Sequence, residues 1–273
     1  MDFYQHLLNA QHKNNSLLCV GLDTDPDKLP LHLRSSGDAV LEFNRRLIDA
    51  TKDIVCAYKI NLAFYEGAGA RAWDILHQTL ASIPEELVTI GDAKRGDIGN
   101  SSEMYARTLM EDYRFTASTV SPYMGEDSVR PFIKNSAQGA FILAVTSNPG
   151  AKDFQYLKIN GRPLYEQVIK RVKKWNSLHN CGLVVGATRP AELKKIRSMT
   201  ADMPFLIPGI GAQGGDLKAA VKYGCDANGA KAVINASRSI IYASKGEDFA
   251  EAARSAALAL RDEINRSRDK FFG

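Results

Sequence analysis

The sequence has few cysteines, and their spacing gives neither a Cys-x-x-Cys pair nor a zinc site. Its 273 residues include four cysteines, of which none forms a Cys-x-x-Cys pair or a cysteine–histidine spacing that fits zinc. Three of them lie in or beside apolar runs, where cysteine usually acts as a small hydrophobic residue. We therefore expect no zinc site, and we expect a protein of a reducing compartment, the cytoplasm.

Long apolar runs are also missing. No stretch approaches the roughly 18 consecutive apolar residues of a membrane-spanning helix. The N-terminus, Met1-Asp2-Phe3-Tyr4-Gln5-His6, has neither a charged segment nor a long apolar core, as a signal peptide would. The sequence therefore predicts no membrane span and no signal peptide.

A strong charge of one sign is absent as well. The formal net charge is +4, and the basic residues are scattered in small clusters that suit solvated helix faces. Because nucleic-acid binding normally leaves a basic stripe or patch, we expect no nucleic-acid partner. The five histidines lie away from the ends of the predicted strands, and we assign none of them to catalysis.

What the sequence does have is a regular alternation of short apolar runs and amphipathic segments. With 45% apolar and 24% charged residues, the composition is that of an ordinary globular domain. Eight apolar runs, rich in valine, isoleucine and leucine, resemble strands buried on both faces. These runs are Leu17–Leu22, Ile54–Ile60, Leu87–Ile90, Ala117–Val120, Ala140–Val145, Gly182–Val185, Phe205–Ile207 and Ala232–Ile234.

Segments with a helical period separate the runs. They are Asp2–Lys13, Ala39–Thr51, Leu62–Leu80, Ser101–Asp112, Glu126–Asn135, Pro163–Leu178, Pro190–Met199, Gly215–Tyr223 and Asp248–Arg268. No linker or repeat divides the chain, so we predict a single domain over residues 1–273. A doubly wound open sheet would show the same alternation, but the count of eight favours a single (β/α)8 barrel.

One strand end carries a dense group of charges. The run Leu87–Ile90 leads into Gly91-Asp92-Ala93-Lys94-Arg95-Gly96-Asp97-Ile98-Gly99. Because alternate residues of a strand share a face, Asp92 and Lys94 should point the same way, with Asp97 just beyond. A carboxylate and an ammonium side by side keep each other charged, which suits proton chemistry near an anionic substrate.

Polar side chains follow the other predicted strands too, at the edge where barrel enzymes carry their chemistry. Lys59 ends the second strand and is expected beside Lys94 on the third. Two lysines alternating with Asp92 and Asp97 would form a four-charge array. A preorganised electrostatic site explains such an array better than surface charges without a function do. Asp23 follows the first strand and Ser147 the fifth.

The last two strand ends indicate an anion site. The loop Pro208–Gly215 is rich in glycine and opens a helix, and Ser237, Arg238 and Ser239 begin another helix after the eighth strand. Backbone N–H groups at helix starts bind anions, and arginine adds a bidentate donor. Loops after strands seven and eight are the usual phosphate site of such barrels, so we predict phosphate binding there.

The stretch Asp92–Gly99 resembles orotidine 5'-phosphate decarboxylase, whose pattern is Asp-x-Lys-x-x-Asp followed by Ile and Gly or Pro. The resemblance extends over nearly the whole chain. It includes Lys59 in Tyr-Lys-Ile-Asn, Ser147 in Thr-Ser-Asn-Pro-Gly-Ala, and Arg238 in Ala-Ser-Arg-Ser-Ile. The motifs Lys-Ile-Asn and Lys-Arg-Gly-Asp-Ile-Gly-Asn are similar to those of the longer bacterial branch (type 2). The chain departs at Ser101, where the family usually has threonine, and at Ser102, where a small apolar residue is usual.

The resemblance implies a role for each matching residue. Lys94 would donate a proton to C6 of the pyrimidine, Asp92 would face the substrate carboxylate, and Lys59 would bridge Asp92 and the ribose. Asp97 would be donated to the partner's site in a homodimer, with Ile98 and Ser101. The remaining expected substrate contacts are Asp23 to the ribose, Ser147 to the pyrimidine edge, and Gln213, Ser237 and Arg238 to the phosphate.

The implied reaction converts orotidine 5'-monophosphate, a small nucleotide, to UMP and carbon dioxide without a metal or an organic cofactor. A magnesium-dependent sugar-phosphate decarboxylase of the same superfamily is the alternative, but that group has an acidic ligand where this chain has Lys59. A sugar-phosphate-binding barrel without activity is a third hypothesis, although the charges are all retained. Either the loop after the seventh strand or the segment Lys152–Asn160 is expected to close over the substrate.

Overall fold

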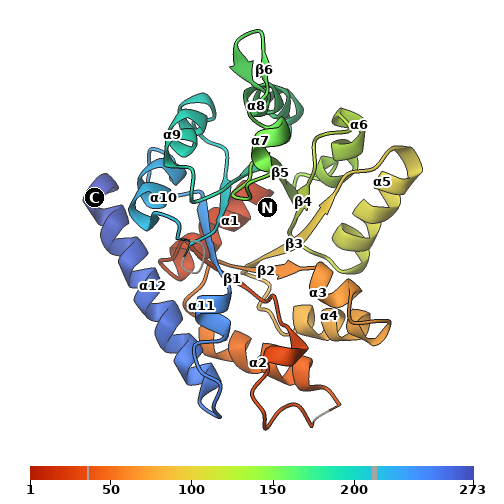
Figure 1. Ribbon diagram of the computed structural model, residues 1–273, viewed down its shortest axis with the longest axis vertical. Coiled ribbons are helices and arrows are strands. Elements are labelled where there is room, and N and C mark those ends of the chain that lie inside the picture. The colour runs from red at the N-terminus through yellow and green to blue at the C-terminus, as the bar shows by residue number, and fades with distance from the viewer. Residues whose placement is uncertain (36, 211–213) are drawn as a thin grey trace.

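The computed structural model describes residues 1–35, 37–210 and 214–273. Within them, eight parallel strands form a closed barrel in the order β1-β10-β9-β8-β5-β4-β3-β2. The strands are β1 Leu18–Gly21, β2 Ala57–Asn61, β3 Val88–Arg95, β4 Ala117–Val120, β5 Gly139–Val145, β8 Cys181–Val185, β9 Phe205–Pro208 and β10 Ala232–Ala236. Helices surround the barrel (Figure 1). The predicted (β/α)8 barrel is therefore confirmed, and the open sheet is excluded.

The barrel strands have two buried faces, which explains their near-continuous apolar sequence. Every residue of β4 and of β8 is buried. Inward side chains such as Val88, Ile90 and Phe141 fill the barrel, and outward ones such as Ile142 and Val185 pack beneath the helices. Alternation along each strand thus separates two apolar cores.

The helices follow the predicted segments with changed bounds. They are α1 Phe3–Lys13, α2 Ala39–Thr51, α3 Ala63–Glu66, α4 Arg71–Ala81, α5 Gly99–Ala106, α6 Glu126–Val129, α7 Ala151–Phe154, α8 Leu164–Trp175, α9 Pro190–Met199, α10 Leu217–Gly224, α11 Arg238–Ile241 and α12 Phe249–Phe272. The helix predicted over Leu62–Leu80 is two helices, because Gly69 adopts a φ of +83° between them. The helix predicted over Ser101–Asp112 ends at Ala106 and continues as a π-helical turn, Arg107–Asp112.

Some elements were not predicted. After β5, the chain forms α7 and a short antiparallel hairpin, β6 Lys158–Ile159 and β7 Arg162–Pro163. Two-residue strands are too short to leave an alternating pattern. No helix in the described part of the chain is long and apolar enough to cross a membrane.

Helix α1 closes the barrel at the end where the strands begin. Phe3 is fully buried, and its ring packs edge-on against Phe141 of β5 at 5.8 Å between centroids. Gly139 leaves room for this ring, since a Cβ there would lie 2.4 Å from Phe3. The amino ends of the strands are therefore covered, and the carboxyl ends remain as the open end.

Candidate active site

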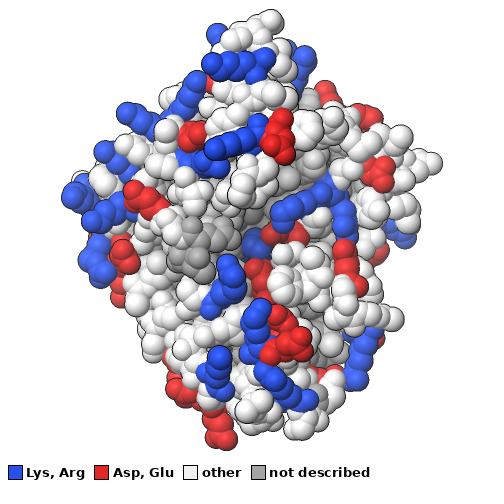
Figure 2. Space-filling model, viewed as in Figure 1, with Lys and Arg blue, Asp and Glu red and all other residues white. Residues whose placement is uncertain are grey.

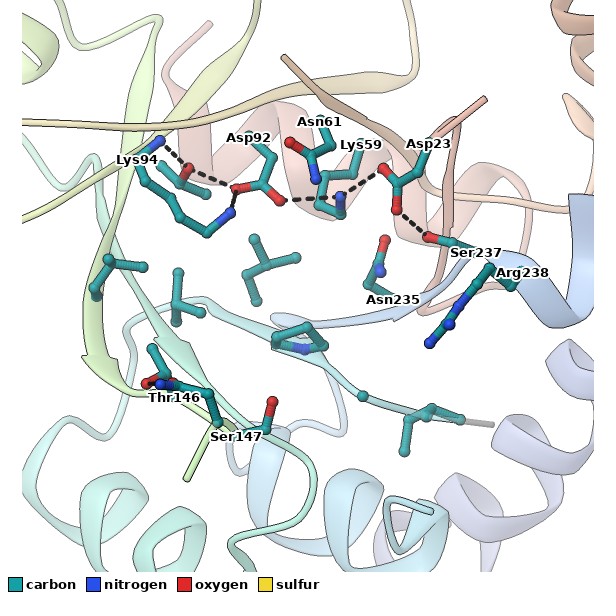
Figure 3. A pocket seen from close by; sticks show the side chains of 18 of the residues that line it. Asp23, Lys59, Asn61, Asp92, Lys94, Thr146, Ser147, Asn235, Ser237 and Arg238 are labelled. Atoms are coloured by element: carbon teal, nitrogen blue, oxygen red, sulfur yellow. Dashed lines mark hydrogen bonds and ion pairs between the residues drawn. The ribbon is translucent and has the colours of Figure 1, made fainter. Parts of the chain in front are cut away.

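A cavity of about 540 Å³ lies at the carboxyl ends of the barrel strands. Figure 2 shows the hollow near the centre of this face, with acidic and basic side chains around it. Charged residues form one wall of the cavity, and Thr146 and Ser147 lie across from them (Figure 3). Leu143, Val184 and Leu206 give the interior an apolar surface. Polar groups on two facing walls and an apolar interior suit a flat ring that carries charged substituents.

Strand β3 supplies two of the charges. It does not end at Ile90, as predicted, but continues to Arg95 with an irregularity in its pairing to β4 after Gly91. Lys94 adopts a φ of +49°, in the left-handed region that residues other than glycine seldom occupy. Its Nζ lies 2.6 Å from Oδ1 of Asp92. The predicted proximity of Asp92 and Lys94 is confirmed.

Lys59 lies at the centre of the charged wall, two residues before β2 ends at Asn61. Its Nζ is 3.1 Å from Asp23 Oδ1 and 3.1 Å from Asp92 Oδ2. Burial alone would lower the pKa of Lys59, but the two carboxylates outweigh this effect and raise that pKa above its usual value. Lys59 is therefore a fixed, permanently charged ammonium.

Asp92 is ionised for the same reason. Burial alone would raise its pKa, but Lys59 and Lys94 together lower that pKa to about 2. The side chain of Lys94 is half exposed, at 50%, whereas that of Lys59 is only 6% exposed. All four members of the network line the cavity, and Lys94 is the more accessible of its two ammonium groups.

The membership of the network differs from the prediction. The expected array contained Asp97, but the structure places Asp23 in that position, giving Asp23–Lys59–Asp92–Lys94. Asp97 follows β3, and its carboxylate accepts the N–H of Ile98 at 2.8 Å, outside the cavity lining. Asp97 is separate from the network of its own chain because β3 extends to Arg95, so that Asp97 lies beyond the barrel edge.

Ile98 and Ser101 also lie outside the cavity lining, exposed at the start of α5. The neighbouring Ser102 is buried, and its hydroxyl donates to the carbonyl of Ser128 at 2.8 Å. This bond explains how a hydroxyl is accommodated at a position where an apolar residue was expected.

The start of α11 carries the predicted anion-binding residues. Ser237, Arg238 and Ser239 all line the cavity. The hydroxyl of Ser237, however, donates to Asp23 Oδ2 at 2.8 Å. Its hydroxyl proton is therefore used to orient Asp23, and among the described residues Arg238 is the cationic side chain that lines this end of the cavity. Gln213, predicted in the same site, lies outside the described residues.

Six polar lining residues were not assigned a site role from the sequence. They are Asn61 of β2, Thr119 of β4, Thr146, Asn148 and Gln155 after β5, and Asn235 of β10. The hydroxyl of Thr119 donates to Asp92 Oδ1 at 2.9 Å. The alternation of inward residues along β4 was the signal that could have found Thr119, since Ala117 two residues earlier faces the barrel interior.

The fold and the cavity together define a (β/α)8-barrel enzyme with its charged residues at the carboxyl end of the strands. The chain belongs to the orotidine 5'-phosphate decarboxylase / HUMPS family, whose model matches residues 16–255. In the described part of the chain, no three or more His, Cys, Asp or Glu side chains are grouped so as to hold a metal ion.

Curated relatives match over their full length. An orotidine 5'-phosphate decarboxylase of Dehalococcoides mccartyi (strain BAV1) is 52% identical, with 99% of this chain and 100% of the relative covered. One from Ralstonia nicotianae is 49% identical, with 98% and 100% covered.

Solved structures of similar proteins have the same fold. Leishmania donovani OMP decarboxylase has a TM-score of 0.86 and 37% identity, with 98% of this chain and 99% of that chain covered. Leishmania donovani UMP synthase has a TM-score of 0.88 and 39% identity over 98% of this chain, which spans only 57% of that longer chain.

Proposed function

We propose that this chain decarboxylates orotidine 5'-monophosphate to UMP and carbon dioxide, the last step of de novo UMP synthesis. The observation that carries the proposal is the Asp23–Lys59–Asp92–Lys94 network on one wall of the cavity (Figure 3). The family and its curated relatives support the same reaction. We further propose that residues 1–273 act as one catalytic domain.

Lys94 is the proposed proton donor. Loss of carbon dioxide breaks the bond between C6 and the carboxylate carbon, and the electron pair stays on C6 with no adjacent group to accept it. A fixed ammonium beside C6 stabilises that charge and then transfers its proton to form the C6–H bond. Lys94, whose side chain is half exposed and whose Nζ lies 2.6 Å from Asp92 Oδ1, suits this role.

Asp92 is proposed to face the carboxylate that leaves. Because Asp92 is ionised at neutral pH, two negative charges would lie close together in the bound state and separate as carbon dioxide departs. Asp92 also orients Lys94, and that contribution follows directly from the contact between them.

Asp23 and Lys59 are proposed to hold the ribose hydroxyls. Asp23 has one oxygen on Lys59 and the other on Ser237, so its carboxylate is fixed at the cavity wall. A carboxylate next to an ammonium presents an acceptor and a donor to neighbouring hydroxyl groups. This pair lies between Asp92 and Arg238 along the wall, where a ribose would join the pyrimidine to the phosphate (Figure 3).

The phosphate is proposed to bind Gln213, Ser237 and Arg238, and Ser147 to meet the pyrimidine edge. Arg238 and Ser147 both line the cavity, on different walls. Binding energy from the phosphate, remote from C6, lowers the barrier if it is realised only in the transition state.

We also propose a homodimer in which Asp97 reaches the partner's site. Asp97 lies at the mouth of its own barrel but not in its own cavity. Exposed apolar residues follow it along the chain: Ile98, just before α5, and Met104 on α5 are each 57% exposed, and Tyr105 on α5 is 40% exposed. An apolar surface of this kind, next to a carboxylate unused in its own cavity, supports an interface between two copies. The four free, buried cysteines support the expected reducing, cytoplasmic setting.

The magnesium-dependent sugar-phosphate decarboxylase is disfavoured by Lys59. Its ammonium lies between Asp23 and Asp92, the two carboxylates that would otherwise attract a divalent cation. A cation placed there would meet a like charge that cannot leave, because Lys59 is buried and its pKa is raised.

A UMP-forming assay tests the proposal. The purified chain is given orotidine 5'-monophosphate with and without EDTA, and 3-keto-gulonate 6-phosphate with magnesium in parallel. We expect UMP formation that EDTA does not change and no turnover of the sugar phosphate. Absence of UMP formation by folded protein would refute the proposal, and loss of activity in EDTA would favour the alternative.

A further inference from the structure

Thr119 lies at the point where the pairing of β3 with β4 is irregular. Gly91 pairs with Ser118, and Arg95 pairs with Val120, so Thr119 alone stands opposite the three residues from Asp92 to Lys94. Such a bulge removes regular ladder bonds from the longer strand and redirects its side chains. The side chain of Thr119 is in the barrel interior, and the residue is only 1% exposed.

The Thr119 hydroxyl fills the gap that the bulge leaves. Its Oγ1 accepts the backbone N–H of Lys94 at 2.9 Å and donates to Asp92 Oδ1 at 2.9 Å. The direction is fixed, because an N–H can only donate and an ionised carboxylate can only accept. Asp92 Oδ1 also accepts Lys94 Nζ at 2.6 Å.

These contacts close a ring that begins and ends in Lys94. It runs from the Lys94 backbone N–H through the Thr119 hydroxyl to Asp92 and back to Lys94 Nζ. The ring connects the ammonium to a backbone with a φ of +49°, a conformation that persists only where surrounding contacts maintain it. One buried hydroxyl thus determines both the backbone of the lysine and the orientation of the carboxylate.

We propose that Thr119 is a positioning residue for the decarboxylation, which holds the Lys94 ammonium and the Asp92 carboxylate in their reactive arrangement. The inference rests on the proposed function. Thr119 acts through Lys94 and Asp92, so its loss should slow the chemical step more than it weakens nucleotide binding.

The test compares Thr119→Val, Thr119→Ser and Thr119→Ala with a matched control, Thr116→Val. Valine keeps the shape of threonine but neither donates nor accepts, and serine keeps the hydroxyl. Thr116 is a suitable control because its Oγ1 likewise accepts a backbone N–H of β3, that of Thr89 at 3.2 Å, but it does not line the cavity.

We expect kcat to fall about ten- to a hundredfold in Thr119→Val, the effect of losing a hydrogen bond to a charged group. KM and the Kd for UMP should stay within about threefold of wild type, a split that indicates an effect on the chemical step. Thr119→Ser should keep most of the wild-type kcat, as should Thr116→Val.

A wild-type kcat in Thr119→Val, or an equal loss in Thr116→Val, would overturn the proposal. If Thr119→Val does not fold, the serine and alanine variants decide, since they differ only in the hydroxyl; equal kcat values in the two would overturn it. An inactive wild-type chain would instead refute the proposed function, so the two failures are distinguishable.

Discussion

Lys59 and Lys94 have the same side chain but different environments, and this difference assigns their roles. Lys59 is buried between two carboxylates, where an unpaired ammonium would be very unfavourable. Lys94 is paired with Asp92, lines the cavity, and has a side chain that is 50% exposed. An ammonium paired with two carboxylates, like that of Lys59, suits the positioning of other groups. An ammonium paired with one carboxylate, like that of Lys94, can transfer a proton to a ligand.

The depressed pKa of Asp92 predicts a pH dependence of stability. A carboxyl group whose pKa falls from 3.8 to about 2 on folding stabilises the folded state above pH 3.8, and that contribution is lost as the pH falls through about 2. The contribution should be roughly 2 kcal/mol. In urea unfolding, the free-energy difference between wild type and Asp92→Asn should therefore narrow as the pH falls from 4 to 2. A constant difference over this window would contradict the ionised network.

Individual residues of the site could be predicted only where their strand position was clear. Asp92, Lys94 and Lys59 were predicted from strand ends and alternation, and they do form one network. Thr119 was not predicted because it lies within β4, whereas the predicted site residues follow the ends of the strands or lie at them. The sequence did not show that Asp23, and not Asp97, joins the network of its own chain. That membership depends on where β3 ends, and no local sequence pattern gives that end.

At the scale of elements, the apolar runs were sufficient to predict the strands. All eight predicted runs overlap barrel strands, and Ala117–Val120 matches β4 residue for residue. The break between α3 and α4 and the π-helical turn after α5 were not predictable, because backbone conformations at single residues decide them. The hairpin β6–β7 is too short for periodicity to detect.

The contact between β1 and the start of α11 yields a prediction about an element boundary. Gly21 ends β1, and a Cβ there would lie 1.9 Å from the Ser237 hydroxyl oxygen. Gly21→Ala should therefore displace Ser237 from Asp23, raise KM severalfold and destabilise the fold by about 1–3 kcal/mol. Steady-state kinetics and urea unfolding measure the two effects.

Gly37→Ala provides the control for this change. A Cβ at Gly37 would find its nearest side-chain atom 3.8 Å away, at Arg71. Wild-type kinetics in both glycine variants would contradict the close approach of β1 to α11 and its role in orienting Asp23.

At the scale of the whole molecule, the barrel separates stability from chemistry. Helix α1 and the inner apolar cluster fill the end where the strands begin, and the charged network occupies the other end. The surface around Asp97 and α5 adjoins the open end, so a second copy seated there would complete the cavity rather than cover the closed end.

The proposed shared site predicts complementation between two inactive variants. In a heterodimer of Asp97→Asn and Lys94→Ala chains, one of the two sites would hold both native residues. Random mixing should therefore restore about one quarter of wild-type activity, since half of the dimers are mixed. Each variant dissociated and reassociated alone is the control. No recovery in verified heterodimers would contradict donation of Asp97 across the interface.

The turnover number of the Lys94→Ala variant tests the proposed role of Lys94 as the proton donor to C6. The alanine variant keeps Asp92, Lys59 and the proposed phosphate-binding residues but lacks the ammonium that we propose stabilises and protonates C6. The account predicts that kcat falls on the order of 10³-fold or more, while the Kd for UMP stays within about threefold of wild type. A wild-type kcat in folded Lys94→Ala protein would contradict the account.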